Sequence, residues 1–145
     1  MDAGWMALLS RKGLLAIAAV IDVALHGLGR PVSAKALAAR HNLPSRHLEP
    51  VLQALVRFGI LKGIRGPRGG YELARERRRI TADDILRAAG TIEEANGASN
   101  VGSELLDQVV LPAVGQAEKA FSSALNRINL DELVRRAEPL RDASA

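Results

Sequence analysis

The segment that most constrains the fold is a basic, glycine-rich turn at residues 65–70, with the sequence Arg-Gly-Pro-Arg-Gly-Gly. Residues 59–64 before it and residues 71–74 after it are short and largely apolar, as β-strands often are. Gly and Pro at these positions favour a tight turn between paired strands. The pattern therefore predicts a β-hairpin with a basic tip.

Three helical stretches precede this hairpin. Residues 5–27 are apolar on nearly every face, which predicts a helix that is covered on several sides. Ser33 is placed to cap a short helix at residues 34–41, and a third helix follows at residues 45–58. Three helices and a hairpin predict a winged helix-turn-helix domain over residues 1–89, in a mainly α-helical chain.

The chain after the hairpin is predicted to be helical with one break. Thr81 and Asp84 have the spacing of a capping box, which opens a helix that ends where a linker at residues 90–102 begins. This linker is rich in Gly, Asn, Ser and Glu. Near the end of the chain we expect a short helix at residues 131–137 and a loose tail at residues 139–145.

A long helix is predicted from Ser103 to about Ile128, with a kink at Pro112 because proline removes one backbone hydrogen bond. Its apolar stripe cannot be buried against a small winged domain alone, so residues 103–138 are assigned to dimerisation. A partial cap over the first helix is the alternative. The residues of the stripe are Leu106, Val110, Val114, Phe121 and Leu125.

The charge is divided between the two halves of the chain. Residues 1–80 hold 14 Lys and Arg against 5 Asp and Glu, a net charge of +9, whereas residues 81–145 hold 6 against 11, a net charge of −5. A basic first half suggests contact with a polyanion, and an uneven solvated surface is the alternative.

Several classes of chemistry are excluded by composition. The chain has no cysteine, which excludes disulfides, thiolate zinc sites, cysteine-ligated iron–sulphur clusters and cysteine nucleophiles. The three histidines, His26, His41 and His47, lack ligand spacing, so no metal site is expected. No catalytic constellation can be assembled, and the sequence predicts no enzyme. Aromatic residues make up 3%, which argues against a binder of single-stranded nucleic acid.

No membrane segment is predicted. The apolar run at residues 13–25 is shorter than the roughly 18 residues that a spanning helix needs, and Asp22 interrupts it. We therefore expect a cytoplasmic protein.

The motifs around the hairpin resemble the Rrf-two family of bacterial winged helix-turn-helix transcription regulators. This family includes the iron–sulphur cluster regulator, the nitric-oxide-sensing repressor and the cysteine-metabolism repressor. The similarity spans residues 8–90 and returns weakly at residues 128–134. The matching segments are Leu48-Glu49, residues 59–61, residues 64–75, Ile80-Thr81 and Asp84-Ile85.

The resemblance implies a homodimer that binds double-stranded DNA as a regulator, more often a repressor, and reads a near-palindromic operator. Helix 45–58 would enter the major groove and the wing, residues 61–74, the minor groove. Glu49 and Arg65 match family positions, whereas Pro50 departs from the pattern and predicts a loosened, kinked or 3₁₀ first turn. The candidate DNA contacts are Ser45, Arg46, His47, Glu49, Arg65, Arg68, Gly69 and Arg75.

Many family members hold a cluster on three cysteines in the segment that corresponds to residues 90–102, which has none here. No cofactor is therefore expected, and a small molecule, a protein partner or no effector at all remain open. The alternative function is a regulatory protein that acts mainly through a protein partner, with weak or non-specific DNA binding.

Overall fold

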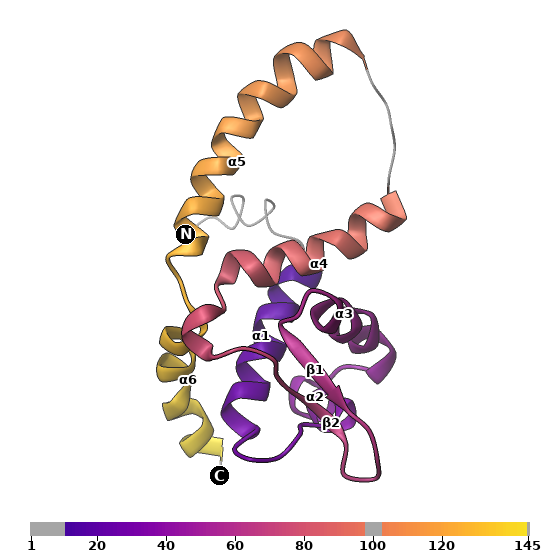
Figure 1. The fold of residues 1–145 in the computed structure, drawn as a ribbon, viewed down its shortest axis with the longest axis vertical. Helices are drawn as coiled ribbons and strands as arrows, with labels where there is room; N and C mark the ends of the chain where they lie inside the picture. Colours follow the sequence, from indigo (N-terminus) through magenta and orange to yellow (C-terminus); the bar gives the residue numbers. More distant parts are fainter. Residues whose placement is uncertain (1–10, 98–102, 145) are drawn as a thin grey trace.

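The computed structural model describes residues 11–97 and 103–144 of the 145-residue chain. The fold is mainly α-helical with one antiparallel hairpin, as predicted (Figure 1). The elements are α1 (Arg11–His26), α2 (Ala34–His41), α3 (Ser45–Arg57), β1 (Leu61–Ile64), β2 (Gly70–Leu73), α4 (Ala82–Gly97), α5 (Leu111–Asn126) and α6 (Leu130–Ser144).

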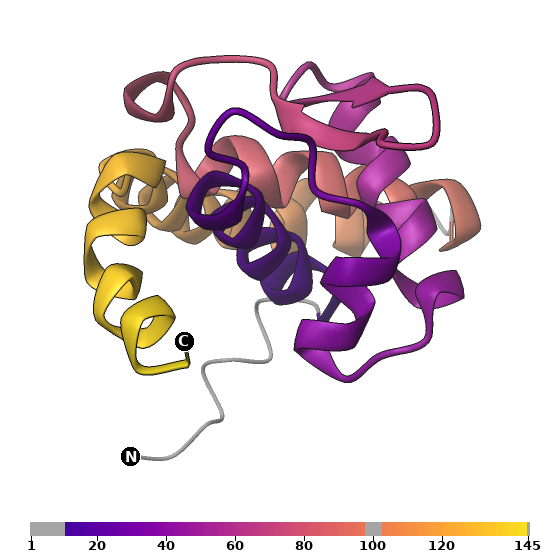
Figure 2. The same ribbon diagram turned by 90° about the horizontal axis from the view of Figure 1, so that it is seen from below.

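Helix α1 is the centre of the core. It packs against α3, α4, α6 and β2, which explains why apolar side chains occur on nearly all of its faces. Helices α2 and α3 and the hairpin lie on one side of α1, and α6 lies on the other (Figures 1 and 2). Residues 5–10 of the predicted first helix lie outside the described residues.

The predicted hairpin is present, and its two strands pair in an antiparallel register. Leu61 pairs with Leu73, and Ile64 pairs with Gly70. Val32 adds one position of a third strand, because it exchanges two backbone hydrogen bonds of 2.9 and 2.8 Å with Tyr71. Gly70 permits this close approach, since a Cβ there would lie 2.5 Å from the carbonyl of Val32.

Strand β1 starts later than expected. Gly59 and Ile60 are predicted to be strand, but they form the turn that follows α3, where Gly59 adopts a left-handed φ of 75°. The Ile60 N–H donates to the Leu55 carbonyl at 2.9 Å and closes the helix.

The ends of two helices also differ from the prediction. Helix α4 continues past Ala89 to Gly97, because residues 91–97 lack proline and include good helix formers. Helix α6 does not end at residue 137 but continues through Pro139 to Ser144, and Arg141 ties it to α1 by a 3.3 Å hydrogen bond to the Leu25 carbonyl.

The long helix covers residues 104–126, and the Oγ of Ser103 caps it as predicted by accepting from the Leu106 N–H. A π-helical turn at Leu106–Val110 precedes Pro112, which occupies the first turn of α5. The regular α-helical hydrogen-bond pattern is therefore interrupted next to Pro112, where the sequence predicts the loss of one backbone hydrogen bond.

Helix α5 projects from the winged domain at the end of the molecule away from the wing (Figure 1). Its lower end is joined to the start of α4 by backbone hydrogen bonds, from Ala82 to the Ile128 carbonyl and from Leu130 to the Ile80 carbonyl. The predicted capping box is present, with reciprocal 3.1 Å bonds between Thr81 and Asp84. In the described part of the chain, no helix has the length and apolar character needed to cross a membrane.

Candidate nucleic-acid interface

The amphipathic pattern of α3 fixes which of its faces meets solvent. Leu48, Leu52 and Leu55 are fully buried against the core. The predicted contacts at its N-terminal end are all exposed: Ser45, Arg46, His47 and Glu49. Within the described residues, these four side chains make no hydrogen bond or ion pair, so they are available to a partner.

Pro50 leaves the helix intact. Helix α3 runs without interruption from Ser45 to Arg57, with Pro50 inside it. In its first turn, the His47 N–H donates to the Pro44 carbonyl at 3.0 Å, three residues earlier, as in a 3₁₀-helix. A 3₁₀ first turn is one of the three forms that Pro50 predicts. Since Pro50 is exposed, the Arg46 carbonyl that lacks an intrahelical partner lies where water reaches it.

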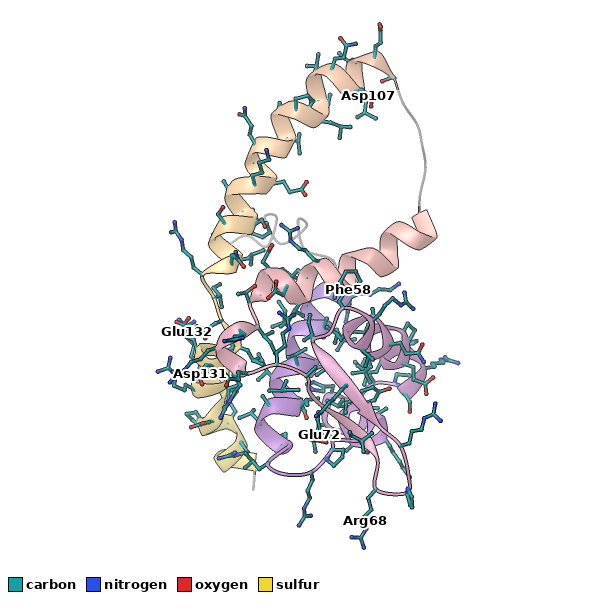
Figure 3. The ribbon with its side chains drawn as sticks, viewed as in Figure 1. Phe58, Arg68, Glu72, Asp107, Asp131 and Glu132 are labelled. Atoms are coloured by element: carbon teal, nitrogen blue, oxygen red, sulfur yellow. The ribbon has the colours of Figure 1, made fainter. Side chains whose placement is uncertain are left out.

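The wing presents two arginines on a tight turn. Gly66 adopts a φ of 115°, and the Gly69 N–H donates to its carbonyl at 2.9 Å. Arg65 and Arg68 are both exposed, and Arg68 points away from the body at the tip (Figure 3). An exposed arginine pair on a narrow β-turn has the size and charge to enter a DNA minor groove.

Arg75 is placed differently from the other predicted contacts. Its Nε donates to the Gly59 carbonyl and its Nη1 to the Arg79 carbonyl, both at 3.2 Å. Nη1 also lies 3.7 Å from a carboxylate oxygen of Asp84. Arg75 thus links the turn after α3 to the segment before α4, and it remains a predicted DNA contact.

A buried carboxylate holds α2 in place. It belongs to Asp22, the residue that interrupts the apolar run at residues 13–25 in the sequence. Asp22 on α1 is 7% exposed at its side chain and accepts from Arg40 Nε at 2.9 Å and from Nη2 at 2.7 Å. His41 Nε2 lies 3.1 Å from the same carboxylate. These hydrogen bonds raise the pKa of Arg40 above its ordinary value, so the guanidinium is cationic. The signal for this buried ion pair in the sequence is a lone acidic residue inside an apolar helix.

The predicted dimerisation stripe is only partly covered. Leu106, Phe121 and Leu125 are half-buried, whereas Val110 and Val114 are exposed at 40% and 55%. Their apolar neighbours Leu105, Val109 and Leu111 are exposed at 53% or more. These three residues lie within or directly beside the π turn and are not part of the predicted stripe.

Polar contacts fix the lower end of α5. Ser122 Oγ donates to a carboxylate oxygen of buried Asp83 at 2.6 Å, and Arg87 donates to the other oxygen of Asp83 at 2.7 Å. Thr81 Oγ1 donates to Asn126 at 3.0 Å. The exposed half of α5 is therefore held in a defined direction relative to the winged domain.

Charge follows the same division in space as in the sequence. Arg68 lies at the wing, while Asp107 lies at the far end of the long helix and Asp131 and Glu132 lie on α6 (Figure 3). The tip of the wing is thus basic, and several acidic residues lie on the helices away from it.

Comparison with known proteins gives consistent matches over most of the chain. The family model Rrf2, described as an iron-dependent transcriptional regulator, matches residues 9–136. The HTH-type transcriptional regulator IscR of Xenorhabdus nematophila is 30% identical over 134 residues, which cover 91% of this chain and 82% of that protein.

Two solved structures share the fold. IscR of T. potens is 32% identical with a TM-score of 0.64, and the match covers 93% of this chain and 87% of that one. CymR, the global cysteine regulator of B. subtilis, is 29% identical with a TM-score of 0.65, and the match covers 88% and 96%. All of these relatives are regulators, not enzymes.

The donor set does not fit the iron–sulphur chemistry of cluster-bearing regulators. Such clusters are held by cysteine thiolates, and this chain has no cysteine. Across residues 11–97 and 103–144, no group of three or more His, Asp or Glu side chains is arranged to hold a metal ion.

Proposed function

Because the chain belongs to the Rrf2 family of transcriptional regulators, we propose that it acts as a homodimer that binds a near-palindromic operator and represses transcription there. The observation that carries this proposal is the presence of two exposed polar surfaces whose side chains have no partner within the described residues. The N-terminal end of α3 presents Arg46 and Glu49, and the wing presents Arg65 and Arg68.

The two surfaces have complementary tasks. Arg46 can donate to the O6 and N7 acceptors of guanine, and Glu49 can accept from the amino group of cytosine, so α3 would read bases in the major groove. Arg65 and Arg68 would enter the minor groove, where the negative potential is strongest when the groove is narrow. The helical path of α3 around Pro50 favours this function over the alternative of a regulator that acts through a protein partner.

The exposed apolar stripe on α5 supports the homodimer. Leu105, Val109 and Val114 are exposed at 55% or more, although such side chains stabilise a fold when buried. Contact with a second copy about a two-fold axis would cover both stripes at once. The dimer would then place its two α3 helices about 34–36 Å apart, one turn of DNA.

Repression and independence from iron complete the proposal. Repression needs only that the bound dimer occupies DNA that RNA polymerase requires. Without cysteines the chain would respond to some signal other than cluster assembly.

The test is capture of fragmented host genomic DNA by the purified protein, followed by sequencing, at two salt concentrations. We expect a near-palindromic motif that persists at the higher salt. Arg46→Ala is expected to weaken binding to that motif by about 5- to 150-fold, the equivalent of one bidentate base contact. Arg127→Ala, an exposed arginine at the end of α5, is the control and should bind as the wild type does. Uniform, salt-sensitive enrichment would refute specific recognition.

The oligomeric state is tested by sedimentation equilibrium. Val114→Glu puts a charge into the proposed interface and should shift the protein from dimer to monomer without loss of helical circular dichroism. Gln116→Glu adds the same charge to α5 outside the predicted stripe and should leave the dimer intact. Equal behaviour of the two variants would contradict the proposed interface. In a transcription assay on a promoter with the captured motif, wild-type protein should lower the yield of transcript.

A further inference from the structure

A basic groove separates the wing from the loop that joins α1 to α2. Its volume is about 810 Å³ and it is open to solvent. Its walls combine residues 26–40, from the end of α1 to α2, with residues 67–69 of the wing, and none of the lining residues is acidic. The lining residues used below are His26, Arg30, Ser33, Arg40, Pro67 and Arg68.

The arginines of the groove differ in how they are held. Arg40 is fixed at its Nε and Nη2 by Asp22, so only the Nη1 side of the guanidinium remains for a ligand. Asp22 also offsets the charge of Arg40. Arg30 and Arg68 are exposed and, in the described part of the chain, their side chains have no acidic partner. The groove therefore carries an excess of about two positive charges.

The start of α2 adds to this field. Ser33 is its N-cap and accepts the Ala36 N–H at 3.1 Å, so the positive end of the eight-residue helix lies at the groove wall. Backbone N–H groups, a helix dipole and arginines from two other segments together favour a compact ligand with two negative charges.

We propose that this groove binds a phosphate group, held by Arg30 and Arg68 with Arg40 as a pre-positioned third donor. The phosphate has two sources with the same chemistry. One is the DNA backbone between the major and minor grooves, since Arg68 belongs to the wing and α2 directly precedes α3. The other is a phosphorylated small molecule. The DNA source rests on the proposed function, whereas binding of free phosphate does not.

The first arm of the test uses inorganic phosphate. At constant ionic strength, replacing chloride by phosphate should raise the melting temperature of the wild-type protein. The gain should disappear in Arg30→Gln and persist in Arg127→Gln, an exposed arginine at the C-terminal end of α5. Arg40→Gln is avoided, because it would leave Asp22 buried without its cation.

The second arm measures binding to duplex DNA as a function of salt. If the backbone fills the groove, the slope of log K against log salt should fall by about 0.9 in Arg30→Gln, on the captured motif and on random duplex alike. Arg127→Gln should keep the wild-type slope.

The two arms separate the possible results. A change in the slope assigns the groove to DNA, and loss of the phosphate effect alone assigns it to a small phosphorylated ligand. A protein that shows the phosphate effect but captures no operator would refute the proposed function and support the groove. Equal behaviour of Arg30→Gln and Arg127→Gln in both arms would overturn the inference.

Discussion

The contact between Asp22 and Arg40 predicts that removal of one partner destabilises the protein more than removal of the other. Asp22 is 7% exposed and Arg40 is 36% exposed at the side chain. Removing Arg40 leaves a buried carboxylate with only His41 beside it, whereas removing the charge of Asp22 leaves a cation that water can reach. Arg40→Ala should therefore cost more stability than Asp22→Asn.

The magnitude follows from burial. Breaking a fully buried ion pair by deleting one partner costs about 3–5 kcal/mol. Because Arg40 is about one-third exposed, solvent already screens the pair, and we expect a loss of about 2–3 kcal/mol for Arg40→Ala. For Asp22→Asn we expect about 1 kcal/mol, since the amide can still accept one hydrogen bond.

The assay is urea unfolding followed by circular dichroism at fixed protein concentration, with the free energy of unfolding taken from the midpoint and the slope. Arg136→Ala is the matched control, because it removes an exposed pair with Glu132 on α6 and should cost less than about 1 kcal/mol. The double variant Asp22→Asn/Arg40→Ala should lose less than the sum of the single losses. Additive losses, or an Arg40→Ala loss no larger than that of Arg136→Ala, would refute the reasoning.

Two further predictions concern the frame around the interface. Gly70→Ala should destabilise the domain by more than about 2 kcal/mol, because its Cβ would meet the Val32 backbone at 2.5 Å, while Gly63→Ala has open space and should change the melting temperature little. Thr81→Ala removes the hydroxyl that accepts the Asp84 N–H, so it should lower the free energy of unfolding by about 1 kcal/mol in the same assay. Thr81→Ser retains a hydroxyl and should keep most of that stability.

The sequence was sufficient where local chemistry decides the structure. The glycine-rich turn, the Ser33 cap and the capping box at Thr81 each depend on residues within a few positions of one another, and the structure has all three. The buried face of α3 followed from the spacing of its leucines.

The sequence was insufficient where contacts between distant segments decide. Pro139 suggested an end to α6, but the helix continues because Arg141 reaches the Leu25 carbonyl from 116 residues away. The sequence offered no sign that the guanidinium of Arg75, a predicted DNA contact, binds the Gly59 carbonyl. The basic groove could not be predicted either, since its walls come from α1, α2 and the wing.

The junction between α4 and α5 connects the winged domain, which is proposed to bind DNA, to the helix that is proposed to form the dimer. The direction of α5 relative to the winged domain is set by Ser122 and Asn126 on α5, which bond Asp83 and Thr81. In a two-fold dimer formed through α5, that direction sets the distance between the two α3 helices, because the winged domain itself is one packed core. A helix of 16 residues is about 24 Å long, so a tilt of 10° at this junction moves its far end by about 4 Å. That displacement exceeds the 3.4 Å rise of one base pair. In the proposed dimer, this polar junction would therefore determine which half-site spacing the two α3 helices can bind.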